Sequence, residues 1–117
     1  MSTEHKGDIW VIRIQGELTR NEEQPFFQVY PWLNQTEDTK YILFDMTGLQ
    51  YINSAGISLL IRFVREAQQR QHSSFAFGVS PHYQKIFRIV GLTAYMELFP
   101  DEYSAMETLN ARSSFEQ

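Results

Sequence analysis

A chain of 117 residues, 43% hydrophobic and 15% aromatic, is near the usual size of one domain and can fill one core. Its formal net charge of −4, without any Lys/Arg cluster, argues against binding to nucleic acid or to an anionic membrane. The absence of cysteine excludes disulfides and thiolate chemistry, and no apolar run approaches the roughly 20 residues of a membrane-spanning helix. We therefore expect a soluble cytoplasmic domain, without membrane insertion, whose partners are proteins.

The first part of the chain predicts two strands and a helix. Residues 9–15 form a β-rich run, and residues 3–6 are expected to pair back on it as an antiparallel edge strand. Thr19 or Asn21 can cap a first helix, which Pro31 is expected to break or kink. The inner face of this helix is expected to carry Phe26, Phe27, Tyr30 and Leu33.

Two buried strands and a long helix are predicted in the middle of the chain. Residues 41–44 and residues 75–79 are apolar stretches of the kind found in strands covered on both faces. Between them, a helix is predicted from about Ser54 to Gln71, because apolar side chains recur there at helical spacing. These side chains are Ile57, Leu60, Ile61 and Val64. Residues 45–53 carry turn chemistry and are predicted to form a loop.

The last third of the chain predicts two more helices around a short strand. Ser80 is expected to cap a helix with Pro81 at the tolerated first position. Its inner face is expected to carry Tyr83, Ile86, Phe87 and Val90. Residues 96–99 predict a strand, Asp101 opens a final helix, and residues 112–117 are expected to fray. The alternation indicates an α/β fold, a small mixed sheet with parallel central strands and about four helices.

One segment joins the central strand to the long helix and places a serine at the junction. It reads Asp-Met-Thr-Gly-Leu-Gln-Tyr-Ile-Asn-Ser-Ala-Gly-Ile over residues 45–57, and the serine is Ser54. The segment resembles the signature of the STAS domain, found in bacterial anti-sigma factor antagonists and at the ends of sulfate transporters. The resemblance also includes Gly16-Glu-Leu18, Ser80-Pro81, Gly91-Leu92 and Leu98-Phe99-Pro-Asp101 in the family's order and spacing. It covers about residues 7–110 of an expected single domain, 1–117.

The resemblance implies a regulatory function for Ser54. In phospho-regulated members of the family, the modified residue directly follows an Asp or Asn in this loop, here Asn53. The family implies an anti-sigma factor antagonist that binds an ATP-dependent serine kinase, the anti-sigma factor, when it is unphosphorylated. Phosphorylation of Ser54 would release the kinase, and a PP2C-type phosphatase would restore the binding form. The chain would be a substrate and an adaptor, not an enzyme, with no cofactor.

Ser54 also has two other interpretations. A serine at a helix N-terminus can act as a cap, because its hydroxyl accepts a backbone hydrogen bond worth about 1 kcal/mol. A nucleophilic serine of a hydrolase is disfavoured, because the Gly-x-Ser-x-Gly motif is absent and no histidine is well placed as its base. A phosphate would be tolerated by the helix dipole but would cost several kcal/mol inside a partner interface. The capping and the regulatory interpretations both remain open.

A partner-binding face is predicted around the start of the long helix. It comprises Asn53, Ser54, Ala55, Gly56, Ser58, Leu59, Arg62 and Phe63. Leu59 and Phe63 lie away from the apolar stripe, so either they are exposed or another element covers them. If they are exposed, Leu59→Asp should weaken partner binding and leave stability nearly unchanged.

Asp45 and Gly48 are interpreted as structural residues of the loop. Asp45 ends the buried strand, where a carboxylate can cap the next turn through backbone N–H groups, or alternatively contact the kinase. No metal site is expected, because the three histidines (His5, His72 and His82) lack ligand spacing and are expected in solvent.

Two positions depart from the family pattern. Asn53 replaces a frequent Asp, and Thr19 stands where many antagonists have Asp after Gly-Glu-Leu. These changes affect which kinase would be recognised. The alternative function is a STAS scaffold, a transporter-associated subunit or a regulator of a non-sigma output, with Ser54 only as a contact residue.

Overall fold

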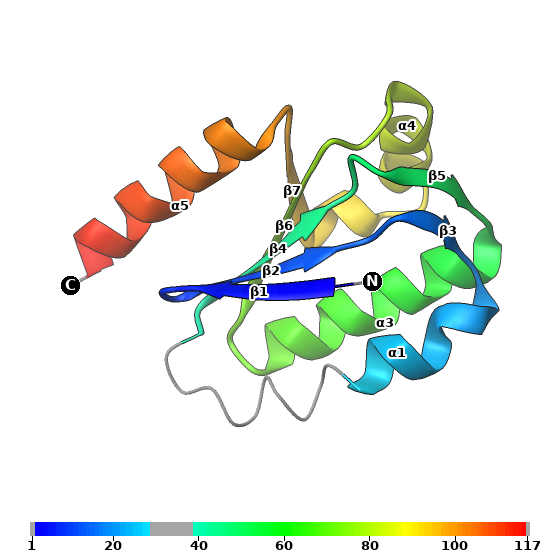
Figure 1. Cartoon of the computed structure of the whole chain (residues 1–117), viewed down its shortest axis with the longest axis horizontal. Coiled ribbons are helices and arrows are strands. Elements are labelled where there is room, and N and C mark those ends of the chain that lie inside the picture. The colour runs from blue at the N-terminus through cyan, green and yellow to red at the C-terminus, as the bar shows by residue number, and fades with distance from the viewer. Residues whose placement is uncertain (1, 29–38, 117) are drawn as a thin grey trace.

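Five strands form the main sheet, in the order β1-β2-β4-β6-β7 (Figure 1). Their bounds are β1 (Ser2–Lys6), β2 (Ile9–Arg13), β4 (Tyr41–Asp45), β6 (Ser73–Phe77) and β7 (Met96–Phe99). The computed structural model describes residues 2–28 and 39–116. Strand β1 is antiparallel to β2, and all other neighbours in this sheet are parallel. The predicted mixed sheet with parallel central strands is therefore confirmed.

Helices cover both faces of this sheet. The described residues form four α-helices: α1 (Glu23–Gln28), α3 (Ser54–Gln69), α4 (Pro81–Ile89) and α5 (Glu102–Glu116). Short 3₁₀ helices, η1 (Arg20–Glu22) and η2 (Leu92–Ala94), precede α1 and β7. Among the described helices, α1, α3 and α4 lie on one face and α5 lies on the other (Figure 1).

Alternation along the central strands divides the core into two layers. On β2 and β4, Ile12 and Phe44 belong to the core beneath α1, α3 and α4. Val11 and Leu43 belong to the core beneath α5, with Ala105 and Leu109 of that helix. Both faces need apolar side chains, which explains why residues 41–44 are an unbroken apolar run.

The first helix begins as predicted and packs inward. The Thr19 hydroxyl accepts a hydrogen bond from the Asn21 N–H at 3.2 Å, which caps η1 before α1 starts. Phe26 of α1 is 1% exposed, and its ring lies edge-on to that of Phe63 at 5.5 Å between centroids. The predicted contribution of Tyr30 and Leu33 and the break at Pro31 lie outside the described residues.

The segment predicted as a loop between β4 and α3 contains a strand. Strand β5 (Leu49–Ile52) pairs in parallel with β3 (Gly16–Leu18) to form a separate two-stranded sheet. Local turn chemistry did not reveal it, because its hydrogen-bond partners lie more than thirty residues earlier in the chain. This small sheet carries the chain to the start of α3.

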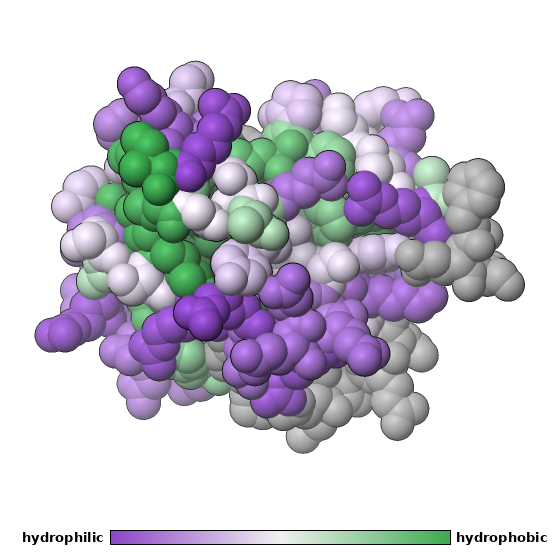
Figure 2. Space-filling model, turned by 180° about the vertical axis from the view of Figure 1, so that it is seen from behind, coloured by the Kyte–Doolittle hydropathy of each residue, from purple (hydrophilic) through white to green (hydrophobic). Residues whose placement is uncertain are grey.

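The C-terminal half shows smaller differences from expectation. Ser80 accepts a hydrogen bond from the Tyr83 N–H and caps α4 as predicted, but Val90 is 43% exposed and does not line an inner face. Ile89 is exposed beside it, and Figure 2 shows hydrophobic surface on the side where α4 lies. Residues 112–116, which were expected to fray, continue helix α5 to Glu116.

No helix among the described residues is long and apolar enough to cross a bilayer.

Candidate functional site

Asp45 organises the turn at the end of β4. Its carboxylate accepts a hydrogen bond from the Thr47 N–H at 3.0 Å and another from Arg13 at 2.6 Å. Partial burial opposes ionisation of Asp45, but the hydrogen bonds from Thr47 and Arg13 outweigh it and lower the pKa of the carboxyl group. These contacts support the structural interpretation of this residue.

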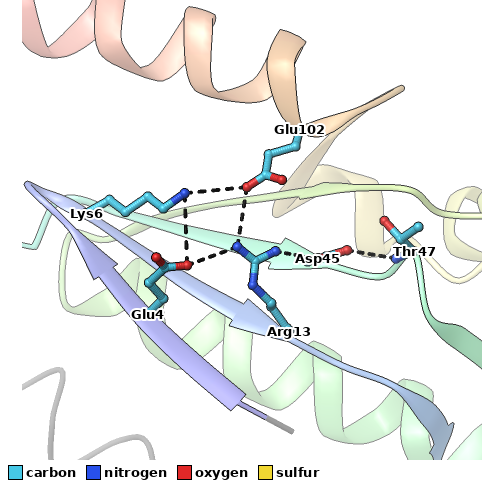
Figure 3. Close-up of polar contacts among 6 residues, drawn as sticks. All are labelled: Glu4, Lys6, Arg13, Asp45, Thr47 and Glu102. Carbon is cyan, nitrogen blue, oxygen red and sulfur yellow. Dashed lines mark hydrogen bonds and ion pairs between the residues drawn. The ribbon is translucent and has the colours of Figure 1, made fainter.

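Arg13 links Asp45 to the helix on the other side of the sheet. Figure 3 shows its guanidinium between Asp45, Glu4 of β1 and Glu102 of α5, with Lys6 beside the two glutamates. The distances from Arg13 are 3.0 Å to Glu4 and 3.4 Å to Glu102. Hydrogen bonds to Glu4 and Asp45 raise the pKa of Arg13, so it stays charged. Through Arg13, this network connects the start of α5 to the end of β4. The segment that leads to Ser54 begins at that end of β4.

Three contacts hold the end of β5 and the start of α3 in place. The Asn53 N–H donates to the Leu18 carbonyl of β3 at 3.4 Å. The Ile52 N–H donates to the Tyr83 hydroxyl of α4 at 3.1 Å. Gly56 is buried, and a Cβ there would overlap the Leu18 carbonyl oxygen. The start of α3 is therefore held in close contact with β3, which only glycine at this position permits.

Asn53, not Ser54, caps α3. The Asn53 side-chain oxygen accepts a hydrogen bond from the Gly56 N–H at 2.9 Å, and its extended backbone (φ −102°) is typical of a cap. Ser54 is the first residue of the helix. The interpretation of Ser54 as the capping residue is therefore wrong, because the amide one position earlier already performs that function.

The Ser54 side chain is exposed at the positive end of a helix of 16 residues. Its hydroxyl forms no hydrogen bond with any described residue. Its carbonyl accepts a hydrogen bond from the Ser58 hydroxyl at 3.0 Å, one turn along. The N–H groups at the start of a helix have no acceptors within it, so an anion on Ser54 would find donors there.

A hollow of about 230 Å³ begins at Ala55, the residue that follows Ser54. It is lined by Arg20, Glu23, Ala55, Ser58, Leu59 and Arg62. Arg62 pairs with Glu23 at 3.4 Å, and its guanidinium lies over the Phe27 ring at 4.4 Å from the centroid. The surface around Ser54 is therefore built from α3 together with η1 and α1.

The predicted partner-binding face is only partly at the surface. Leu59 is 4% exposed and Phe63 is fully buried, since α1 packs over this side of α3. The hypothesis that they form an exposed apolar pair is wrong, as is a surface function for the buried Gly56. Ser54, Ser58 and Arg62 are exposed, and Asn53 and Ala55 are half-buried. The structure therefore places a smaller, more polar set of residues at this surface.

Two residues at this surface were not predicted from the sequence. Arg20 and Glu23 come from η1 and α1, about thirty residues before Ser54. The predicted cap at Thr19 indicated a helix start, but no periodic pattern indicated that it would pack against α3. Among the described residues, no three His, Asp or Glu side chains lie close enough to hold a metal ion.

Comparison with known proteins identifies the family. The model of the STAS domain matches residues 1–105. The chain belongs to the STAS domain family. This STAS protein is similar to an "Anti-sigma F factor antagonist" of Paenibacillus polymyxa, with 20% identity over 110 residues that cover 94% of each chain.

Solved structures share the fold of this STAS domain. The structure titled "Moorella thermoacetica RsbS S58E" matches with a TM-score of 0.83 and 17% identity, covering 97% of each chain. The Bacillus cell fate determinant SpoIIAA in its phosphorylated form matches with a TM-score of 0.72 and 23% identity. That match covers 92% of this chain and 97% of the SpoIIAA chain. Four helices around a mixed, mostly parallel sheet therefore form a STAS fold.

Proposed function

We propose that this protein is an anti-sigma factor antagonist of a partner-switching pathway, with Ser54 as its phosphorylation site. Unphosphorylated, it binds an anti-sigma factor that is also an ATP-dependent serine kinase. The kinase modifies Ser54 and releases the antagonist, and a PP2C-type phosphatase restores it. Two similar proteins support this proposal. The Paenibacillus relative is named an anti-sigma F factor antagonist, and SpoIIAA has a structure in its phosphorylated form.

The observation that carries the proposal is the division of tasks between two adjacent residues. Asn53 supplies the cap of α3, so the hydroxyl of Ser54 is not needed for helix stability. Ser54 is exposed at the first residue of α3, directly after two residues that bond to β3 and α4. A modification of Ser54 can therefore leave the fold intact and change only the surface that a partner meets.

The electrostatics favour a switch in binding rather than in folding. A phosphate adds about −1.5 to −2 charges, which the N-terminus of α3 stabilises in the free protein. In a complex, the same charge loses water or faces the partner's own charges, and every 1.4 kcal/mol changes affinity tenfold. Phosphorylation then weakens the complex while the domain stays folded.

The test is to incubate the purified protein with ATP in an extract of its native cells and to map phosphate by peptide mass spectrometry. We expect phosphate on Ser54, absent from Ser54→Ala and retained in the matched variant Ser58→Ala. Bound kinase should then be retained by Ser54→Ala and lost from Ser54→Asp. An unmodified Ser54, where another antagonist is labelled in the same extract, would instead favour the STAS scaffold or transporter-associated subunit.

A further inference from the structure

Two helices on opposite faces of the sheet each carry a highly exposed hydrophobic side chain. Among the described residues, the large hydrophobic side chains with the greatest exposure are Tyr103 (77%) and Ile89 (75%). Ile89 ends α4, and Tyr103 lies in the first turn of α5, which covers the other face of the sheet (Figure 1). Single exposed apolar side chains are common on protein surfaces, so the charged residues beside these two decide what they can bind.

The surface around Ile89 is apolar and basic. Lys85 lies one turn before Ile89 on the outer side of α4, and Arg88 lies next to Lys85 on that side. Val90, directly after the helix, is 43% exposed and extends the apolar part. Neither Lys85 nor Arg88 forms a side-chain hydrogen bond or ion pair with a described residue. These four residues, which we call the α4 surface, therefore offer two free cations beside two apolar side chains.

The surface around Tyr103 is aromatic and acidic. Glu107 lies one turn after Tyr103 on the outer side of α5, and the exposed Asp101 directly precedes the helix. Glu107 forms no side-chain hydrogen bond or ion pair with a described residue. Arg112, the one cation in the sequence of α5, pairs with Glu97 at 3.4 Å. Asp101, Tyr103 and Glu107, which we call the α5 surface, therefore keep their negative charge.

These two surfaces complement each other in charge and in apolar content. Cations of the α4 surface can meet carboxylates of the α5 surface, while Ile89 and the ring of Tyr103 shield each other from water. Like charges disfavour the pairing of either surface with itself, so the unlike pairing is preferred. Since every copy of the chain carries both surfaces, a second copy supplies the partner. We propose that the protein self-associates head to tail, with the α4 surface of one copy on the α5 surface of the next.

The positions of the two surfaces determine the type of assembly. They lie on opposite faces of the sheet, so one neighbour cannot cover both, and the association continues from copy to copy (Figure 1). The few side chains involved form a small interface, which is typical of weak association. Ser54 belongs to neither surface, so this proposal goes beyond the antagonist function and can fail or hold independently of it.

The test is sedimentation equilibrium of the full chain from about 10 μM to about 1 mM. We expect the weight-average mass to rise with concentration above the 13.8 kDa of one chain. It should fall again when the ionic strength is raised from about 0.05 M to about 0.5 M, because salt screens the charges. Ile89→Asp and Tyr103→Asp should each weaken self-association at least about tenfold. The control Tyr51→Asp replaces a tyrosine that is 46% exposed outside both surfaces and should associate like wild type.

A mixture of the two variants tests the head-to-tail arrangement. Ile89→Asp keeps its α5 surface and Tyr103→Asp keeps its α4 surface, so an equimolar mixture should regain one interface and stop at mixed dimers. If Ile89→Asp does not fold, Arg88→Glu keeps both apolar side chains of the α4 surface and should weaken self-association about threefold.

Three outcomes overturn the proposal: a wild type that stays monomeric up to about 1 mM, a variant at either surface that associates like wild type, or a mixture that stays monomeric. If the monomeric wild type instead sediments with phosphatidylglycerol vesicles, the basic α4 surface binds a lipid surface and not a second copy.

Discussion

The two ends of α3 satisfy their polar groups in opposite ways. At the N-terminal end, Asn53 bonds the Gly56 N–H and leaves the Ser54 hydroxyl free in solvent. At the C-terminal end, the His72 N–H closes back on the Ala67 carbonyl at 2.9 Å. Its ring Nδ1, however, is buried with Ser74 Oγ and has no partner in the described residues.

This difference separates two kinds of free polar group. A free hydroxyl in water loses nothing, because water bonds to it, and it remains available to a modifying enzyme. A hydroxyl without a partner in the interior has lost its hydrogen bonds to water, and no enzyme can reach it. Of these two serines, only Ser54 is therefore accessible to a modifying enzyme.

The largest expected effect tests whether the N-terminal half of α3 is a surface or a core element. Leu59→Asp places a charge at a position that is 4% exposed and should lower the free energy of unfolding by more than about 4 kcal/mol. Thermal or denaturant unfolding measures this. Ser58→Asp, at the exposed neighbouring position, should change stability by less than about 0.5 kcal/mol. Unchanged stability in Leu59→Asp would instead support the hypothesis that Leu59 is exposed in the partner-binding face.

A smaller effect is expected at the turn that leads into β5. Asp45→Asn should lower the free energy of unfolding by about 2 kcal/mol at pH 7, since Asp45 is hydrogen-bonded to Arg13 and Thr47 and 16% exposed. The matched variant Glu4→Gln removes an exposed partner of the same Arg13 and should cost less than about 0.5 kcal/mol.

The pH dependence of Asp45→Asn has a definite sign. Because the pKa of Asp45 is lower in the folded state, its stabilisation is present above the unfolded pKa of about 3.9. It is lost as pH falls through the lower folded pKa. The difference in unfolding free energy between wild type and Asp45→Asn should therefore shrink on acidification. A difference that stays constant from pH 7 to pH 2 would contradict the assigned ion pair.

The smallest effects compare the two ends of α3 directly. Asn53→Ala removes the cap and should lower the free energy of unfolding by about 1 kcal/mol, whereas Asn53→Asp keeps it. Ser74→Ala removes a hydroxyl without a protein partner and should leave stability within about 0.5 kcal/mol of wild type, or raise it. Chemical denaturation of both variants gives the two values. An equal loss in Ser74→Ala would show that its hydroxyl is bonded in the free protein.

The local parts of the fold were predictable because they depend on residues close in sequence. The caps at Thr19, Ser80 and Asp101 form with neighbouring N–H groups, and each begins a helix or 3₁₀ turn as predicted. The buried strand at residues 41–44 follows from its continuous apolar run. Strand β5 was missed because its stability depends on pairing with the distant β3.

In the candidate site too, the features that depend on nearby residues were predictable and those that depend on distant packing were not. The sequence indicated Ser54 at the junction of a strand and a helix, but placed the cap on that serine instead of on Asn53. Angular position along a helix identified Leu59 and Phe63 as lying off the main stripe, yet it could not show that α1 covers them. The contribution of Arg20 and Glu23 to the surface depends on that same packing.

The sequence by itself determined the family, the order of most elements and the position of one serine at a helix start. Periodicity, capping residues and turn chemistry act over a few residues, so they can be read along the chain. Only the tertiary structure decided which polar groups are free: the exposed Ser54 hydroxyl and the buried Ser74 hydroxyl. Both are serines near an end of α3, and their different burial results from packing between segments that are distant in the sequence.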